Sequence, residues 1–462
     1  MEEAVFSPPI DEGRWVRQGP RSLESGHTSS QVAIIYFTPK IFQVPKPLKE
    51  SKPDAYTPQT LGLGPYHHLR PDLHRTHQKK LAQISLFQAR GGDSPKTQFF
   101  SQEALRRVRD IEPLVRVQYD KYLDLEGSTL EHIFLLDSFF LFDFLGLYKE
   151  NMDVWKFDTG HKEVVKDVLM LENQIPKKAL EEVGKEIGLF SPERDTTTKM
   201  LYAQLFYCFC KAHSPLKLSE WACIDGWGTH HLLSFMYSSI ISNRPITPEE
   251  EKLQDPEAMG VTTRRRIERA LSELRLGGPS MQSFLGTPAV AKNKKQERKT
   301  RVISRRVIPS ATELSKMHEV VFRVLKPDEG IGNIGFTRHL EGEKPTIHLP
   351  EITFRFDSEV ILRNLLAYEA AVDGPEPLGR YVDLMIDLLQ TAQDVAMLRQ
   401  RGIVKGDTVS DGEIVEIFRG IGKSGANPTL WSTTTRVVDE VKSMVDESKM
   451  TVLVKNWTPM GF

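Results

Sequence analysis

Cysteine is scarce in this chain, since its 462 residues include only three. An odd number cannot be fully paired in a disulfide framework, and Cys208 and Cys210 lie within the aromatic run LFYCFC. This setting indicates small buried thiols in a reducing compartment. With Cys223 the pair would offer a soft metal three sulfur ligands, but no fourth ligand follows at a recognisable spacing, so we favour buried thiols over a metal site.

Long apolar runs are also absent. No window of about 18 residues is uncharged and apolar enough to cross a bilayer, so the sequence predicts no transmembrane helix. The first residues, MEEAVFSPPIDEGRW, contain acidic side chains and lack the apolar core of a signal peptide, which argues against a secretory signal or a transit peptide. We therefore expect a cytoplasmic protein, with peripheral attachment to the plasma membrane as the alternative.

The chain has no excess of either charge, because 61 Lys and Arg face 62 Asp and Glu for a net charge of -1. This balance gives no global field that would attract nucleic acid or an anionic membrane. One local basic patch could attract phosphates of lipid, nucleic acid or an import receptor, although it lacks interleaved aromatics for base stacking. We favour a solvated basic loop over a specific partner for its residues, which are Lys292, Lys294, Lys295, Arg298, Lys299, Arg301, Arg305 and Arg306.

Familiar catalytic templates are missing as well. The sequence contains no GxSxG elbow, P-loop, HExxH or kinase motif set. Gly62 and Gly64 precede Pro65 without the helix-opening glycine pattern of a phosphate loop, and this arrangement is typical of a turn. We expect no cofactor and lean towards a protein that is not an enzyme.

The most prominent feature present is the stretch 128–148, STLEHIFLLDSFFLFDFLGLY. Ser128 followed by Glu131 predicts a capping-box helix start, and the apolar run behind it leaves almost no face for water, which predicts a buried core helix. Asp137 and Asp143 inside this run each require a dedicated hydrogen-bond donor. Six residues apart on a helix, they point about 120° from each other and do not form a paired acid and base.

Four histidines precede this helix: His67, His68, His74 and His77. The spacing of the last two would place both imidazoles on one helical face, as a metal site requires. No carboxylate motif accompanies them, so the favoured interpretation is a polar helix start whose histidines bind backbone groups or pair with Asp72.

The sequence LENQIP at 171–176 lies at a predicted joint between two helices, the second beginning near Pro176. Side chains such as Glu172, Asn173 and Gln174 hydrogen-bond free backbone groups at helix ends, which is a sufficient structural reason for their presence. The alternative is an active-site role for Glu172, although no nucleophile lies beside it in the sequence.

The remaining patterns divide the chain into four parts. We expect a disordered leader at 1–30, a helical part at 31–244, a polar and basic linker at 245–300, and a C-terminal part at 301–462 that packs on the first helical part. The last part contains amphipathic helices, one of them running continuously from 381 to 398, and β-type runs that predict a small antiparallel sheet. The fold class is therefore mainly α, with a minor β component.

Several phrases in this order resemble the plant domain-of-unknown-function 247 family, also called uncharacterised protein family 0481. They are GPYHH at 64–68, FLLDSFF at 134–140, LENQIP at 171–176, SATEL at 310–314 and NLLAYE at 364–369. The resemblance extends from about Val32 to Val454. It marks as family-motif residues without a settled role Gly64, Pro65, Tyr66, His67, His68, Asp137, Glu172, Asn173, Gln174, Pro176, Asn364, Tyr368 and Glu369.

The resemblance implies a land-plant protein with a mostly helical body and no established enzymatic activity. Some grass members lie at loci for pollen and stigma self-incompatibility, so this class is among the expectations. Two departures stand out: Lys177 and Lys178 replace aromatic residues common after LENQIP, and the chain ends at VLVKNWTPMGF, where many relatives continue into an apolar spanning helix. We expect either a member without that helix or a chain lacking its last segment.

From these patterns we expect an interaction or signalling scaffold that binds another protein. The alternative is a hydrolase or metal-dependent enzyme that uses the histidine cluster or the region of Glu172.

Overall fold

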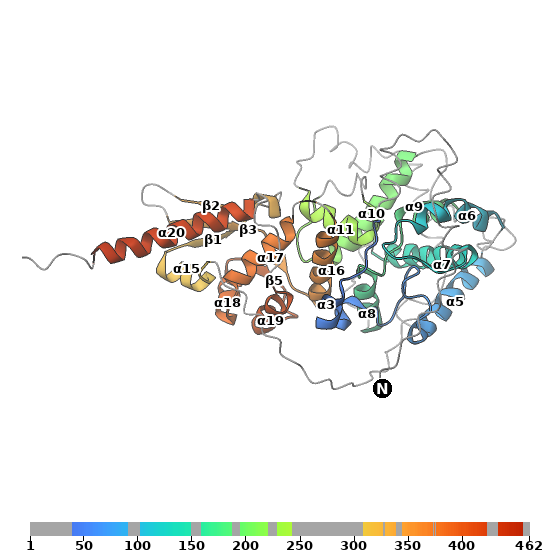
Figure 1. Cartoon of the computed structure of the whole chain (residues 1–462), viewed down its shortest axis with the longest axis horizontal. Coiled ribbons are helices and arrows are strands. Elements are labelled where there is room, and N and C mark those ends of the chain that lie inside the picture. Colours follow the sequence, from blue (N-terminus) through green and yellow to red (C-terminus); the bar gives the residue numbers. More distant parts are fainter. Residues whose placement is uncertain are drawn as a thin grey trace, which may run out of the picture. The chain divides into compact units, whose positions relative to one another are not determined.

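The computed structural model describes residues 39–90, 102–148, 159–186, 195–219, 229–242, 308–326, 329–338, 344–372, 374, 376–422 and 433–455. The chain forms two compact units, and the boundary between them falls within helices α10 (Asp195–His213) and α11 (Leu232–Ile241). Figure 1 shows the elements of both units, which are mostly helical with a few short strands, as predicted. The predicted leader at 1–30 and the predicted linker at 245–300 lie outside the described residues.

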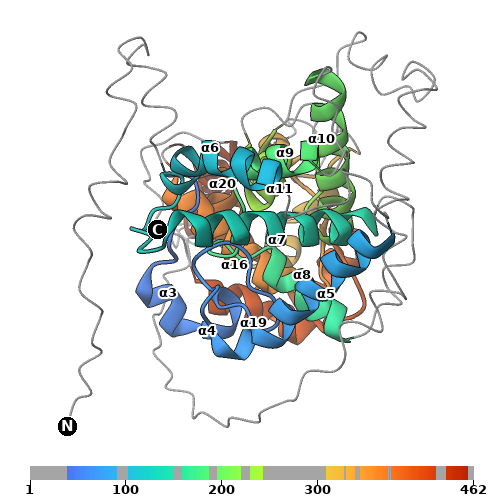
Figure 2. The same ribbon diagram turned by 90° about the vertical axis from the view of Figure 1, so that its right-hand side faces the viewer.

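The first unit is helical. Its elements are α3 (Lys46–Ser51), α4 (Pro53–Tyr56), the 3-10 turn η2 (Pro71–Leu73), α5 (His74–Arg90), α6 (Gln102–Arg116), α7 (Gly127–Gly146), α8 (Thr159–Val168) and α9 (Lys177–Glu186). Helix α7 packs against α5, α6 and α9, and Figure 2 shows it crossing this unit with α6 and α9 above and α5 below.

Helix α7 is the buried core helix that the sequence predicts, since it is buried almost throughout from Leu130 to Gly146. Its predicted capping box is wrong. The helix begins at Gly127 without a side-chain cap, and Glu131 instead forms an ion pair with Arg109, with the closest N and O atoms 2.9 Å apart. Ser128 therefore lies inside the first turn, where its hydroxyl does not perform the predicted N-cap role.

The second unit combines helices with short strands. Its elements are α15 (Ala311–Met317), β1 (Val321–Val324), η6 (Ile331–Asn333), β2 (Gly335–Thr337), β3 (Thr346–Leu349), β4 (Ile352–Thr353), α16 (Ser358–Ala371), α17 (Pro377–Leu388), α18 (Ala392–Gln400), β5 (Val404–Lys405), α19 (Asp411–Ile421) and α20 (Thr433–Lys455). Helix α20 is amphipathic, since Val437, Val441 and Val445 lie on one face and are buried.

The strands form a three-stranded sheet in the order β1-β3-β2 and a two-stranded sheet of β4 with β5. Only β2 and β3 pair in the predicted antiparallel direction, whereas β1 with β3 and β4 with β5 are parallel. Parallel pairing needs a crossover between the strands. Helices α16, α17 and α18 form this connection between β4 and β5. The alternating pattern of a short strand does not indicate whether it pairs in the parallel or the antiparallel direction.

A second correction concerns the single helix expected from 381 to 398. The structure has two helices, α17 and α18, because Thr391 starts a new capping box with Asp394. Gly402 follows the C-cap residue of α18 and adopts a positive φ of 76°, a conformation that commonly ends a helix. No helix in the described ranges combines the length and the hydropathy that a bilayer span requires.

Candidate functional site

The motif residues of the first unit surround an extended segment at 59–64 that runs between α4 and η2. Asp167 at the end of α8 accepts the backbone N–H groups of Gln59, Thr60 and Leu61, with N to O distances of 2.6 to 3.1 Å. Burial raises the pKa of Asp167 to about 7, although the three N–H donors oppose this rise. No local pattern singles out Asp167 in the sequence, where it resembles any polar position on an amphipathic helix.

Asn173 continues the same set of contacts. Its Oδ1 accepts the N–H of Leu63 at 2.6 Å, while its Nδ2 donates to the carbonyl oxygens of Leu61 and Asp167 at 2.8 Å. The amide is fully buried, and these bonds use its acceptor and both donors. Asn173 therefore joins the extended segment to the turn between α8 and α9.

Asp137, which lies on α7, also binds the main chain of segment 59–64. It accepts the N–H of Gly64 at 2.8 Å and the ammonium of Lys80, which also donates to the carbonyl of Gly62. Both members of the ion pair are about 95% buried, since their side chains retain 5% and 4% exposure. Asp143, at the other end of α7, accepts from Gln83, so the prediction that each aspartate has its own donor is confirmed.

Gly64 has a left-handed backbone, with φ at +67°. A Cβ at this position would lie 2.8 Å from the carbonyl oxygen of Gln174 and 3.0 Å from the Tyr119 hydroxyl. Both the conformation and the close approach therefore require glycine. Pro65 follows, and the carbonyl of this proline accepts from Nδ1 of His68 at 2.8 Å.

Gln174 fixes the joint itself. Its Nε2 donates to the carbonyls of Val168 and Met170, and its Oε1 accepts the N–H of Leu233 at 3.0 Å. The hydroxyl of Tyr119 donates to the Gln174 backbone carbonyl. Pro176 follows as the residue immediately before α9, and its carbonyl accepts the N–H groups of Ala179 and Leu180 in the first turn of that helix.

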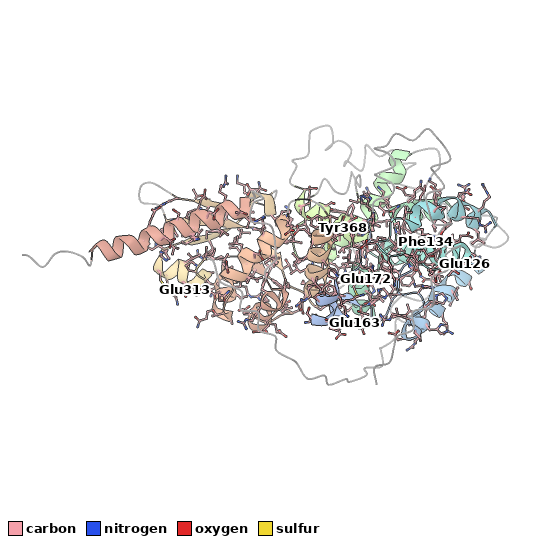
Figure 3. All side chains as sticks on the ribbon, in the orientation of Figure 1. Glu126, Phe134, Glu163, Glu172, Glu313 and Tyr368 are labelled. Carbon is pink, nitrogen blue, oxygen red and sulfur yellow. The ribbon has the colours of Figure 1, made fainter. Side chains whose placement is uncertain are left out.

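Glu172, which is labelled in Figure 3, has three neighbouring polar groups from the N-terminal part of the first unit. Its carboxylate accepts the N–H of Val44 at 2.8 Å and the ammonium of Lys49 at 2.5 Å, and Nε2 of His67 lies 3.5 Å away. Burial opposes ionisation, but these three donors together lower the pKa of Glu172 below its usual value. Tyr66 donates to the carbonyl of Ile41, and burial raises the pKa of this phenol.

His74 and His77 occupy the first turn of α5, as the spacing predicts. Their rings stack with centroids 6.3 Å apart, and burial lowers the pKa of His77. Among the described residues, no group of three or more His, Cys, Asp or Glu side chains could hold a metal ion. The suggested pairing of a histidine with Asp72 is wrong, because Arg70 takes that carboxylate.

The NLLAYE motif lies in the second unit, on α16. Glu369 accepts the N–H groups of Leu378 and Gly379 at 2.8 and 2.6 Å and the hydroxyl of Tyr237 at 2.8 Å. Tyr368 packs edge-on against Tyr237, with ring centroids 5.3 Å apart. Glu369 thus caps the start of α17, and it repeats the chemistry of Asp167: a buried carboxylate that accepts several main-chain N–H groups. Asn364 donates back to a carbonyl one turn earlier in α16, that of Val360.

The second unit contains further buried polar pairs that the sequence did not reveal. Asp357 precedes α16 but makes no side-chain cap bond, and it accepts from Nδ1 of His213 at 2.5 Å. Asp394 accepts from both Thr312 and Thr391. The T-x-x-D spacing at 391–394 is a capping signal that can be recognised in the sequence. His213 and Asp357 are 144 residues apart, so no local pattern indicates that they pair.

Of the remaining predicted site residues, Cys210 is buried and Cys208 is half-buried, both as free thiols. Burial raises the pKa of the Cys210 thiol, which makes it a poor nucleophile. Cys223 and the whole basic patch lie outside the described residues. The motif residues therefore form two sets, one in each unit, and they hydrogen-bond mainly to main-chain groups.

Comparisons with known proteins agree with the motifs. The family described as "Plant protein of unknown function" (DUF247) matches residues 41–459. An Arabidopsis thaliana protein named as a putative UPF0481 protein is 29% identical over 465 residues, which cover 90% of this chain and 83% of that protein. A further UPF0481 protein of Arabidopsis thaliana is 24% identical over 396 residues, covering 83% of this chain and 72% of its own length. No solved structure matches this chain. The chain belongs to the plant domain-of-unknown-function 247 family.

Proposed function

We propose that this protein is a non-enzymatic scaffold that binds another protein through a surface of its first unit. The observation that carries the proposal is the capture of segment 59–64, in which Asp137, Asp167 and Asn173 accept five main-chain N–H groups. Carboxylates saturated by backbone donors are poorly placed to act as a general base or a nucleophile. They are well placed to hold a loop in one conformation.

The rigid segment leads into an exposed apolar position. Leu69 follows the GPYHH motif and has 78% of its surface exposed, and Leu81 on α5 has 40% exposed. His74 and His77 lie on α5 between these positions and are also exposed. Protein interfaces commonly use a preorganised loop that exposes an apolar side chain beside polar neighbours. Such a loop loses little conformational entropy when it binds a partner.

The test compares Leu69→Asp with the matched control Met317→Asp, since Met317 in the second unit is similarly exposed at 74%. Partners captured from plant tissue by the full chain are purified, and their affinity is measured by calorimetry. We expect Leu69→Asp to weaken binding about tenfold or more, and Met317→Asp to leave it unchanged. Equal affinity of both variants, or an activity with bound metal lost in His74→Ala, would replace this proposal by the enzyme alternative.

Attachment to a membrane surface is a second proposal, and the charge of the basic patch supports it. Eight cationic side chains occur between Lys292 and Arg306 with no carboxylate among them except Glu297. Such a segment is attracted to anionic lipids in a salt-dependent manner. Sedimentation with phosphatidylserine vesicles should fall when salt is raised or when the patch is reversed in charge. Binding that responds to neither change would refute attachment through the basic patch.

Protein recognition or membrane attachment would each suit a role in self-incompatibility, for which the identity of the partner is the deciding observation.

A further inference from the structure

Helix α5 has one buried face and one exposed face. The buried face consists of residues at helical spacing, which are Leu73, Thr76, Lys80 and Ile84. The exposed face contains His74, Arg75, His77, Gln78 and Leu81. We call these five exposed residues, together with Leu69, the α5 surface.

The α5 surface is cationic and has no acid of its own. Helix α5 contains neither Asp nor Glu among its 17 residues. Arg75 is exposed, and no carboxylate of the described ranges forms an ion pair with it. Its guanidinium is therefore available to a carboxylate that a partner supplies.

The acids on the elements beside α5 are already engaged. Asp72 in η2 forms an ion pair with Arg70, and Asp137 on α7 forms one with Lys80. Asp143, also on α7, accepts from a side-chain amide of α5. Each of these three carboxylates is thus bound by a side chain that is not part of the α5 surface.

The two histidines of the α5 surface lie beside each other, because their rings stack. Burial lowers the pKa of His77. Lys80 on the same helix and the imidazoles of His74 and His68 add to this lowering, and Asp137 on α7 opposes it. Carboxylates on a bound partner would favour the protonated imidazoles, so binding of an acidic partner would be coupled to proton uptake.

We propose that the α5 surface binds an acidic amphipathic segment of the partner protein. The apolar side chains of that segment contact Leu69 and Leu81, and its carboxylates pair with Arg75 and His74. This inference rests on the proposed function and adds the chemistry of the partner.

The charge of the α5 surface also argues against other occupants. A second copy of this chain would bring like charges together. Anionic lipid is typically recognised by clusters of about four or more Lys and Arg side chains, and single-stranded nucleic acid by stacking on aromatic rings. The α5 surface has one arginine and no phenyl, phenol or indole ring. An acidic protein segment therefore fits it best.

The experiment uses three labelled peptides of about 15 residues as probes of the full chain. All three carry leucines at helical spacing, and their other positions are glutamate, glutamine or lysine. Fluorescence anisotropy should show saturable binding of the glutamate peptide, about tenfold tighter than that of the other two and weakened by salt. No saturable binding of the glutamate peptide, or equal affinity for the glutamine peptide, would overturn the inference.

Arg75→Gln and Arg106→Gln form a matched pair, since each removes one guanidinium from the first unit. Arg106 lies on α6 and forms an ion pair with Asp110 at 3.4 Å, so its charge is compensated. We expect Arg75→Gln to weaken binding of the glutamate peptide about three- to fivefold, and Arg75→Lys and Arg106→Gln to leave it nearly unchanged. Equal effects of the two glutamine variants would contradict the inference, as would sedimentation with phosphatidylserine vesicles that Arg75→Gln abolishes.

Leu69→Asn separates this inference from the proposed function, because it removes the apolar anchor without changing the charge. If the glutamate and glutamine peptides bind equally and Leu69→Asn weakens both, the surface binds a partner but the acidic chemistry is refuted. If Leu69→Asn has no effect while Arg75→Gln weakens the glutamate peptide, the acidic chemistry stands and the anchor of the proposed function is refuted.

The histidines provide a readout that depends on pH. The glutamate peptide should bind more tightly at about pH 6 than at about pH 8, because its carboxylates stay ionised while the imidazoles gain protons. The double variant His74→Gln, His77→Gln should lose most of this difference. Affinity that does not change with pH in the wild type would contradict the role of the histidines in binding.

Discussion

Gly64 donates its backbone N–H to the carboxylate of Asp137 across 2.8 Å, although 73 residues separate them in the sequence. The same carboxylate holds the ammonium of Lys80, so one buried aspartate on α7 fixes both the turn and α5. Either charge would strongly destabilise the folded state if it were buried here without its partner. The family motifs at 64–68 and 134–140 therefore meet in space as parts of one structural unit.

Asp137→Asn should be strongly destabilising, because it leaves the buried ammonium of Lys80 without its counter-charge. We expect a loss of about 3 to 5 kcal/mol in the free energy of unfolding, measured by urea denaturation. Asp143→Asn is the control on the same helix, since Asp143 is half-buried and its neutral partner Gln83 can still hydrogen-bond an amide. Equal effects of the two substitutions would contradict the role assigned to the pair.

Gly64→Ala and Gly402→Ala separate close packing from backbone strain. Both glycines have a left-handed φ, at +67° and +76°, but a Cβ at Gly402 would meet no atom within 4 Å. Gly402→Ala should therefore cost only the conformational strain, about 1 kcal/mol. Gly64→Ala should cost clearly more, because its Cβ would lie 2.8 Å from the Gln174 carbonyl oxygen. Similar melting temperatures for the two variants would refute the close approach at Gly64.

The raised pKa of Asp167 makes the stability of the folded protein depend on pH. Its folded pKa of about 7 lies above the unfolded value, so the folded state binds the extra proton, and the stability from this group is lost as pH rises from about 4 to 7. Asp167→Asn removes this titration. The stability difference between wild type and variant should therefore be larger at pH 5 than at pH 7, by at most about 1.4 kcal/mol per pH unit. A difference that grows between pH 5 and pH 7 would show the opposite sign and refute the assignment.

A substitution at Glu319 should not reduce the stability of the protein, unlike the substitutions described above. It has a φ of 54° between α15 and β1, a conformation that is strained for a residue with a Cβ. Its ion pair with Lys344 is exposed and contributes little. Glu319→Gly should leave stability unchanged or raise it by up to about 1 kcal/mol, and Lys344→Met should have almost no effect. A marked loss in Glu319→Gly alone would indicate a contact of this side chain that the ion pair does not explain.

The sequence predicts those features that depend on local pattern. The buried α7, the need of Asp137 for a donor and the helical joint at LENQIP all follow from periodicity and the cost of burying charge. The capping box at Ser128 was wrong because tertiary pairing of Glu131 with Arg109 outweighs the local motif. The roles of Asp167 and of the pair His213 with Asp357 escaped prediction because their partners are more than 100 residues away in the chain.

Amide hydrogen exchange of segment 59–64 shows whether the polar motif residues hold its main chain. We expect these amides to be protected in the wild type and to exchange much faster in Asp167→Ala, while amides of the second unit, such as those of α18, keep their protection. Rapid exchange of segment 59–64 in the wild type, or protection unchanged in Asp167→Ala, would contradict this role of the motif residues.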